Sequence, residues 1–110
     1  MRRLLPLLGA VVVLAGCGTG GLVKRGDPGT GKQIFTQRLK SGLSCAGCHT
    51  LAAAGATGTV GPNLDLLKPP LARIQKQVIH GGAIMPPFQN VLTQAQIVAV
   101  AKFVASHEGK

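Results

Sequence analysis

The most informative motif in this chain is Cys45-Ala46-Gly47-Cys48-His49. Two cysteines three positions apart, followed at once by a histidine, form the attachment pattern of c-type haem. On one turn of chain, each thiol can add to one vinyl group of the porphyrin, and the adjacent imidazole then points at the iron. The motif therefore predicts one covalent haem c, attached through Cys45 and Cys48, with His49 as an iron ligand.

Two other kinds of site use cysteine pairs at this spacing. A thioredoxin-like redox pair needs a preceding strand within a βαβ unit, and no strand pattern lies near Cys45. A structural zinc site needs four ligands, and the sequence offers no second pair to complete Cys45, Cys48 and His49. The pattern favours haem over both.

The composition is consistent with a large apolar cofactor at the centre of a small domain. The chain has 110 residues, which is room for one domain, and contains three Phe but no Trp or Tyr. A core built from these residues alone would be thin, and a porphyrin would fill it.

The formal net charge is +9. The chain lacks a basic helix or an aromatic stacking platform, so we expect no nucleic-acid partner.

The N-terminus has the pattern of an export signal. Met1-Arg2-Arg3 is followed by an apolar run of 13 residues, Leu4 to Gly16, which is too short to span a bilayer as a helix. The run ends in Leu14-Ala15-Gly16-Cys17, which resembles the lipobox of bacterial lipoproteins. The resemblance implies cleavage before Cys17 and lipid on its thiol. Cleavage elsewhere beside an incidental cysteine, or an uncleaved signal anchor, are the alternatives.

We therefore divide the chain into three parts. Residues 1–16 are predicted to be a lipoprotein signal peptide, residues 17–26 a lipidated N-terminus with a flexible glycine-rich tether, and residues 27–110 the folded domain. With Cys17 assigned to lipid and the other two cysteines to haem, no thiol is left over.

Helical patterns account for most of the predicted domain. Asp27-Pro28 is a helix start, and the residues after it place Gly31, Ile34, Phe35 and Leu39 on one face. Pro69-Pro70 begins a middle helix that ends at Gly81-Gly82. Its apolar face comprises Leu71, Ile74 and Val78.

The last helix has the clearest start. Thr93 to Gln96 forms a capping box, with Leu92 and Ile97 as a hydrophobic staple. Its inner stripe comprises Ile97, Val100, Ala101 and Val104, with Phe103 beside it. No strand pattern appears, and residues 51–60 are expected to be a loop around the haem edge. The predicted fold class is all-α.

Residues 27–110 resemble a class I cytochrome c of the small bacterial type. The resemblance rests on the Cys45–His49 motif, on Gly61-Pro62-Asn63-Leu64, on Met85-Pro86-Pro87-Phe88 and on a closing helix opened by Leu92-Thr93. It implies three to five helices wrapped around one covalent haem. It also implies that the Pro62 carbonyl accepts a hydrogen bond from Nδ1–H of His49, and that Met85 is the sixth iron ligand.

The residues themselves support the choice of Met85. It is the only methionine left once Met1 is removed, and it lies in a loop rich in glycine and proline, residues 81–87. A helical wheel places His80 on the solvent side with Arg73 and Lys76, and His107 lies near the C-terminus. One feature departs from many relatives: Phe35 lies ten residues before Cys45, about twice the usual gap. Residues 38–44 are therefore predicted to form extra helix or a loop.

A haem closed by His and Met has no open coordination place, which favours outer-sphere electron transfer over catalysis. We expect a monomeric, non-enzymatic electron carrier, anchored by lipid outside the cytoplasm. Its basic surface would suit redox partners with acidic docking surfaces. The alternatives are a haem-based gas or redox sensor, and a fixed haem subunit of an oxidase, reductase or dehydrogenase.

Overall fold

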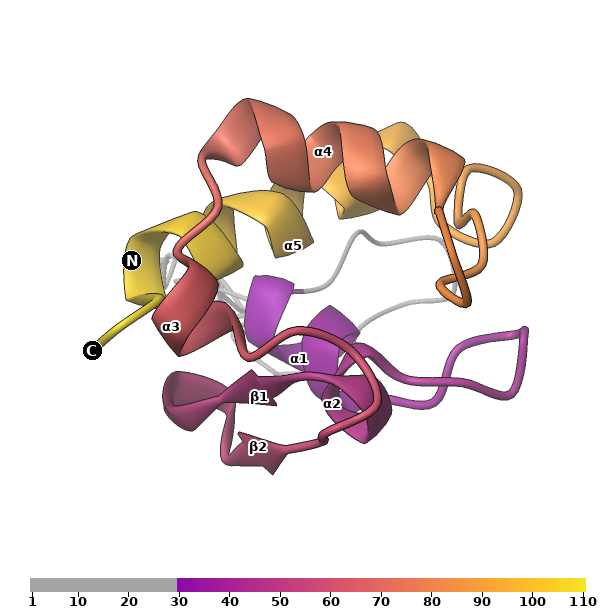
Figure 1. Ribbon diagram of the computed structural model, residues 1–110. Helices are drawn as coiled ribbons and strands as arrows, with labels where there is room; N and C mark the ends of the chain where they lie inside the picture. The colour runs from indigo at the N-terminus through magenta and orange to yellow at the C-terminus, as the bar shows by residue number, and fades with distance from the viewer. Residues whose placement is uncertain (1–29) are drawn as a thin grey trace, which may run out of the picture.

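The computed structural model describes residues 30–110, and within them most of the regular structure is helical. Figure 1 shows the arrangement, with α4 and α5 packed together and α2 and the short strands on the other side of the molecule. The elements, in chain order, are α1 (Gly31–Thr36), α2 (Cys45–Cys48), β1 (Thr50–Leu51), the 3-10 turn η1 (Ala52–Ala54), β2 (Ala56–Thr57), α3 (Leu64–Leu67), α4 (Leu71–His80) and α5 (Gln94–His107). The predicted all-α class I fold is confirmed, with a small sheet in addition. The predicted signal peptide (1–16) and the predicted tether (17–26), with Cys17, lie outside the described residues.

Helix α1 begins later than predicted. Thr30 is its N-cap, and it forms a capping box in which the Thr30 hydroxyl accepts the N–H of Gln33 at 3.2 Å. Gly31 is then the first helical residue, not a residue of the Asp27-Pro28 segment. Thr30 as N-cap satisfies a backbone donor at the start of the helix. Asp27 and Pro28 lie outside the described residues.

The two terminal helices cross at very short range. A Cβ built on Gly31 would lie 2.3 Å from the Cβ of Phe103 and 2.4 Å from the carbonyl oxygen of Ala99, so only glycine allows this approach. Beside the crossing, the rings of Phe35 and Phe103 are 6.2 Å apart between centroids and tilted by 59°, within the range of favourable aromatic pairs. Ile34 is fully buried in the same contact.

Helices α4 and α5 follow the predicted boundaries. The capping box of Thr93 and Gln96 is present at the start of α5, and the predicted inner stripe of that helix is buried. Helix α4 ends at Gly81, whose φ of 66° is readily adopted only by glycine. Of the predicted apolar face of α4, Ile74 and Val78 are buried, whereas Leu71 is 37 % exposed because it lies at the helix start.

Residues 38–44 form a turn, not extra helix. The N–H of Leu39 donates to the carbonyl of Leu43 at 2.9 Å, and the N–H of Gly42 donates to the carbonyl of Leu39 at 2.8 Å. Leu39 is buried and anchors this turn to the core, while Leu43 stays exposed.

The segment after the Cys45–His49 motif contains structure that the sequence pattern did not predict. Strands β1 and β2 pair antiparallel, with Thr50 opposite Thr57 and Leu51 opposite Ala56. They replace part of the loop predicted over residues 51–60. Further on, Asn63 caps α3, because its side chain accepts the N–H groups of Asp65 and Leu66.

The Asp65 carboxylate joins three distant segments. It accepts the N–H of Ala52 at 2.8 Å and that of Gly109 at 2.7 Å. These two hydrogen bonds, the Ala52 one first, lower the pKa of the Asp65 carboxyl. Asp65 therefore ties α3 to η1 and to the end of the chain.

Within residues 30–110, no helix is long and apolar enough to cross a bilayer.

Candidate haem-binding site

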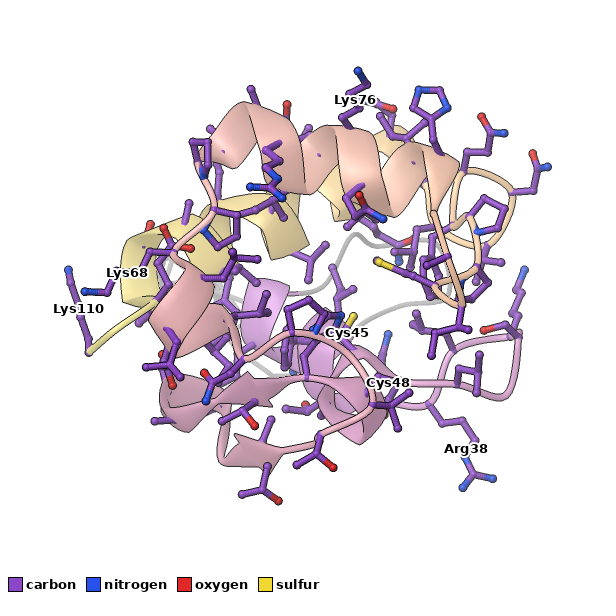
Figure 2. All side chains as sticks on the ribbon, viewed as in Figure 1. Arg38, Cys45, Cys48, Lys68, Lys76 and Lys110 are labelled. Carbon is purple, nitrogen blue, oxygen red and sulfur yellow. The ribbon has the colours of Figure 1, made fainter. Side chains whose placement is uncertain are left out.

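The short helix α2 positions both cysteines of the motif. Ser44 caps it by accepting the N–H of Gly47 at 3.0 Å. Cys45 and Cys48 are its first and last residues, and His49 follows, with its N–H donating to the Cys45 carbonyl at 2.9 Å. Both thiols are unpaired by disulfide, and Figure 2 shows them on α2, on the side of the molecule opposite Lys76 of α4.

A large, mostly apolar cavity lies against this helix. Its volume is about 750 Å³, within the range of protein sites that enclose a small-molecule ligand. Cys45, Cys48, His49, Pro62 and Met85 all line it. Segments far apart in sequence therefore bring every predicted site residue of the domain to one cavity. Its apolar wall includes core residues of α1, α4 and α5, namely Phe35, Ile74, Val78, Val100 and Val104.

The His49 ring is held in one orientation. Its Nδ1 lies 2.8 Å from the carbonyl oxygen of Pro62, and a carbonyl can only accept, so Nδ1 carries the proton and Nε2 keeps its lone pair. A Cβ on Gly61 would lie 2.6 Å from Cε1 of His49, and one on Gly58 would lie 2.6 Å from the Cys48 carbonyl carbon. Two glycines thus let the chain pass directly beneath the motif.

Met85 is presented by a tight turn. The N–H of Gly82 donates to the Met85 carbonyl at 3.0 Å, and the N–H of Met85 donates to the Gly82 carbonyl at 2.9 Å. Ala83, inside this turn, has a φ of 51°, which non-glycine residues seldom adopt. A Cβ on Gly81 would lie 2.5 Å from the Met85 carbonyl oxygen. The backbone at Met85 is therefore closely defined by its neighbours.

The electrostatics of Cys45 argue against thiol redox chemistry. Burial raises the pKa of the Cys45 thiol to about 11, whereas reactive redox cysteines have lowered pKa values. Among residues 30–110, there is also no group of three or more His, Cys, Asp and Glu side chains arranged to hold a metal ion. Neither alternative for the motif gains support from the geometry.

Two polar residues of α4 that the sequence reasoning did not assign also line the cavity, Arg73 and Gln77. The helical wheel grouped Arg73 with His80 on the solvent side, and Arg73 is exposed as predicted, although it also lines the cavity. An arginine side chain is long enough to reach round the helix edge to the cavity. His80 is exposed and does not line the cavity. His107 is exposed as well, with Nδ1 at 2.8 Å from the carbonyl of Phe103.

A helical domain closed around a cavity that holds a Cys-x-x-Cys-His turn defines the class of c-type cytochromes. Residues 26–104 match the family model described as cytochrome c oxidase, cbb3-type, subunit III. The chain therefore belongs to this family of c-type cytochrome domains, whose members bind haem c covalently.

Two known proteins support this assignment. The chain is 34% identical to a cytochrome c6 of Rippkaea orientalis, and the match covers 94% of this chain and 92% of that protein. It is also similar to the crystal structure of the c-type cytochrome SorU from Sinorhizobium meliloti, with a TM-score of 0.66 and 46% identity, over 73% of this chain and 88% of that one.

The cavity fits the cofactor of the family. It is large and apolar, it has two thiols on one short helix, and it contains an imidazole and a thioether as candidate iron ligands. The Pro62 carbonyl orients the imidazole, and the absence of a side chain at Gly61 leaves room for the ring.

Proposed function

We propose that this protein is a monohaem electron carrier, in which Cys45 and Cys48 bond the haem and His49 and Met85 ligate its iron. The observation that carries the proposal is that one cavity of about 750 Å³ brings these four side chains together. Haem c supplies the one-electron chemistry when bound. The chain's own residues hold it, orient its ligands and exclude water from it.

Each of the ligating residues has a distinct role in this proposal. The hydrogen bond from His49 Nδ1–H to Pro62, at 2.8 Å, fixes the tautomer and makes the ligand nitrogen more basic. The thioether of Met85 would occupy the remaining coordination place and raise the reduction potential compared with stronger donors. A closed iron favours electron exchange with partner proteins over turnover of a substrate.

The rim of the cavity offers a contact surface for such partners. Leu43, Val60 and Ile84 line the cavity and are 45 %, 61 % and 76 % exposed. Exposed apolar side chains grouped around an opening are typical of interaction sites. We therefore place the electron-exchange face at this rim.

The charge of the described residues supports the proposal of an acidic partner. Residues 30–110 contain eight Lys or Arg but only two acids, Asp65 and Glu108, and neither acid lines the cavity. A partner with an acidic docking surface would be attracted without opposition. Electron-transfer rates with the native partner should then fall as salt rises, because exposed charges are screened over about 8 Å at physiological ionic strength. Rates indifferent to salt would contradict an acidic partner.

Covalent attachment is tested directly by substitution of the cysteines. The mature protein should show a c-type pyridine haemochrome spectrum, and the haem should stay with the chain in acid acetone. Cys45→Ala with Cys48→Ala should abolish both results, whereas Ala46→Ser, inside the same motif, should leave them unchanged. Haem that extracts freely from the unaltered protein would overturn the attachment.

A carrier differs from a gas or redox sensor in how tightly Met85 ligates the iron. The ferric protein should show the weak near-infrared band of sulfur ligation, and the ferrous protein should resist carbon monoxide at neutral pH. Met85→Ala should remove the band and open the iron, while His80→Ala, on the exposed side of α4, should change neither. Rapid stoichiometric binding of carbon monoxide by the unaltered protein would contradict the carrier hypothesis and favour the sensor.

The location of the carrier is also part of the proposal. Residues 1–16 would direct export and Cys17 would receive lipid, which would hold the protein to a membrane outside the cytoplasm. Mass spectrometry of the mature protein should find a lipidated residue 17 at its N-terminus. Cys17→Ala should release the domain from membranes or leave an uncleaved precursor. An unmodified Cys17 would contradict the anchor.

The family description favours a second candidate, a fixed haem subunit of a larger oxidase. It names a subunit of cytochrome c oxidase. Gel filtration of gently solubilised native membranes separates the two, because a carrier should elute as a small monomer and a subunit should elute with its complex.

A further inference from the structure

A groove on the surface of the domain shares no lining residue with the cavity at α2. Its volume is about 570 Å³, within the range of sites that take a bound ligand. Residues 37–40 and 91–93, together with Gln96, line it. The groove therefore lies between the turn that follows α1 and the start of α5.

The charged residues that line this groove are all cationic. Arg38 and Lys40 both line it, whereas no Asp or Glu does. The two acids of residues 30–110, Asp65 and Glu108, lie next to Lys68. Figure 2 shows Lys68 and Arg38 on opposite sides of the molecule. No acid of the described chain is therefore placed to neutralise the groove, and an anionic ligand would meet both cations unopposed.

The turn that presents the two cations is fixed by its own backbone. The N–H of Leu39 donates to the Leu43 carbonyl at 2.9 Å, and the N–H of Gly42 donates to the Leu39 carbonyl at 2.8 Å. The side chain of Leu39, between the two cations in sequence, is buried in the core. Because the turn is already ordered, less conformational entropy is lost when Arg38 and Lys40 hold a ligand.

The groove also has an apolar part and a free hydrogen-bond donor. Leu39 and Leu92 line it and are buried. Oε1 of Gln96 accepts the N–H of Thr93 at 2.9 Å, so the amide nitrogen of Gln96 keeps its own N–H groups to donate. A matching ligand combines carboxylates, an apolar group and a hydrogen-bond acceptor. An acidic stretch of extended polypeptide has all three.

We propose that this groove docks an acidic, partly apolar peptide segment of a partner protein. Carboxylates of the segment pair with Arg38 and Lys40, an apolar side chain packs on the buried leucines, and a backbone carbonyl accepts from Gln96. The groove is separate from the cavity rim, so a partner held here leaves the rim free for electron exchange and raises the effective concentration of the two proteins. This docking goes beyond the proposed function and does not depend on how the haem iron is ligated.

An anionic bilayer is the other surface that such cations could meet. Protein segments that bind anionic bilayers carry clusters of about four to eight Lys or Arg, whereas only Arg38 and Lys40 line this groove. A bilayer surface would also leave the concave, apolar part of the groove unfilled. The shape and the small number of cations therefore favour a peptide segment over lipid.

The test is a titration of the ferrous holoprotein with synthetic peptides, followed through amide chemical shifts by NMR. A peptide of alternating glutamate and leucine with blocked ends should shift residues 37–42 and 91–96, and its glutamine counterpart should not. Each exposed ion pair contributes up to about fivefold in affinity, so Arg38→Gln with Lys40→Gln should weaken binding by roughly three- to twentyfold. Lys32→Gln is the matched control, because Lys32 is exposed on α1 but does not line the groove. It should change the affinity by less than about twofold.

Several results would overturn the docking site. They are the absence of shifts at millimolar peptide, equal binding of the glutamine peptide, unchanged affinity in the double variant, and shifts confined to the cavity rim at Leu43, Val60 and Ile84. Vesicles of phosphatidylcholine with phosphatidylglycerol are titrated in parallel. If the double variant loses vesicle binding and no peptide binds, the groove contacts lipid and the proposal is wrong. None of these results bears on the haem ligands, which the haemochrome spectrum and carbon monoxide test separately.

Discussion

Replacing Gly31 by alanine tests the packing of the two terminal helices, because helix propensity and close packing predict opposite signs. The new Cβ would lie 2.3 Å from the Cβ of Phe103. Carbon atoms that are not bonded prefer about 3.5–4.0 Å, so α1 would have to move about 1 Å from α5. The atoms in the way include the Ala99 carbonyl oxygen at 2.4 Å, which belongs to helix backbone and cannot rotate aside.

The expected size follows from two opposing effects. Alanine is the better helix former by about 1 kcal/mol. Forcing an extra methyl group into a packed contact costs typically about 1–3 kcal/mol and occasionally more. Here the shift also loosens Ile34 and Phe35, which are buried against α5, so the cost lies toward the upper end. We expect a net loss of about 1–2 kcal/mol in the free energy of unfolding.

Guanidinium denaturation of the ferric holoprotein, followed by circular dichroism, measures this loss. The midpoint should fall at unchanged m-value, and Tm should fall by about 4–8 °C for each kcal/mol in a domain of this size. Lys32→Ala, at the next position and exposed, is the control and should stay within about 0.5 kcal/mol. A Gly31→Ala protein that is equally or more stable would show that the helices do not approach as described.

Three further substitutions probe other contacts. Thr93→Ala removes the cap of α5, which accepts the N–H of Gln96 at 3.1 Å, and should lower the free energy of unfolding by about 1 kcal/mol; no loss would mean that the capping box is not formed in solution. A double-mutant cycle of Phe35→Leu and Phe103→Leu should give a coupling of about 0.5–1.5 kcal/mol, and additive effects would argue against the aromatic pair. Asp65 has a lowered pKa, owing first to the N–H of Ala52, so its contribution is complete above the ordinary carboxyl pKa and is lost as pH falls through the folded value. Asp65→Asn should therefore be less stable than the unaltered protein at pH 7, with a gap that narrows below about pH 4; a gap independent of pH would contradict a stabilising carboxylate.

The sequence predicted the parts of this fold whose signals are local. The capping box at Thr93 and the buried stripe of α5 can be found from a few neighbouring residues, because helix periodicity and cap chemistry act over one or two turns. The site motif is equally local, since Cys45, Cys48 and His49 are contiguous or nearly so. The hydrogen bond between His49 and Pro62 followed only from resemblance, because thirteen positions separate the two residues.

The missed features depend on contacts between distant segments or on very short elements. Strands of two residues and a helix of four, such as α3, are too short to show a period. The reach of Arg73 to the cavity depends on where the edge of α4 lies relative to other segments, which a helical wheel omits. The two hydrogen bonds of Asp65 connect residues 13 and 44 positions away, and no sequence pattern marks them.

The contact of α1 with α5 closes the described chain from its first helix to its last. Both helices contribute to the wall of the cavity, and the other segments that line it lie between them in the chain. Folded domains open locally, and loops with few stabilising contacts open at lower free energy than the helices of the core. Amide hydrogen exchange should then be slowest in the buried stretch around Val100 and faster at Gly82 and Met85. The turn that carries Met85 could open and reclose while the rest of the domain stays folded, so the lifetime of the proposed Met85 ligation would be set by local opening and not by unfolding.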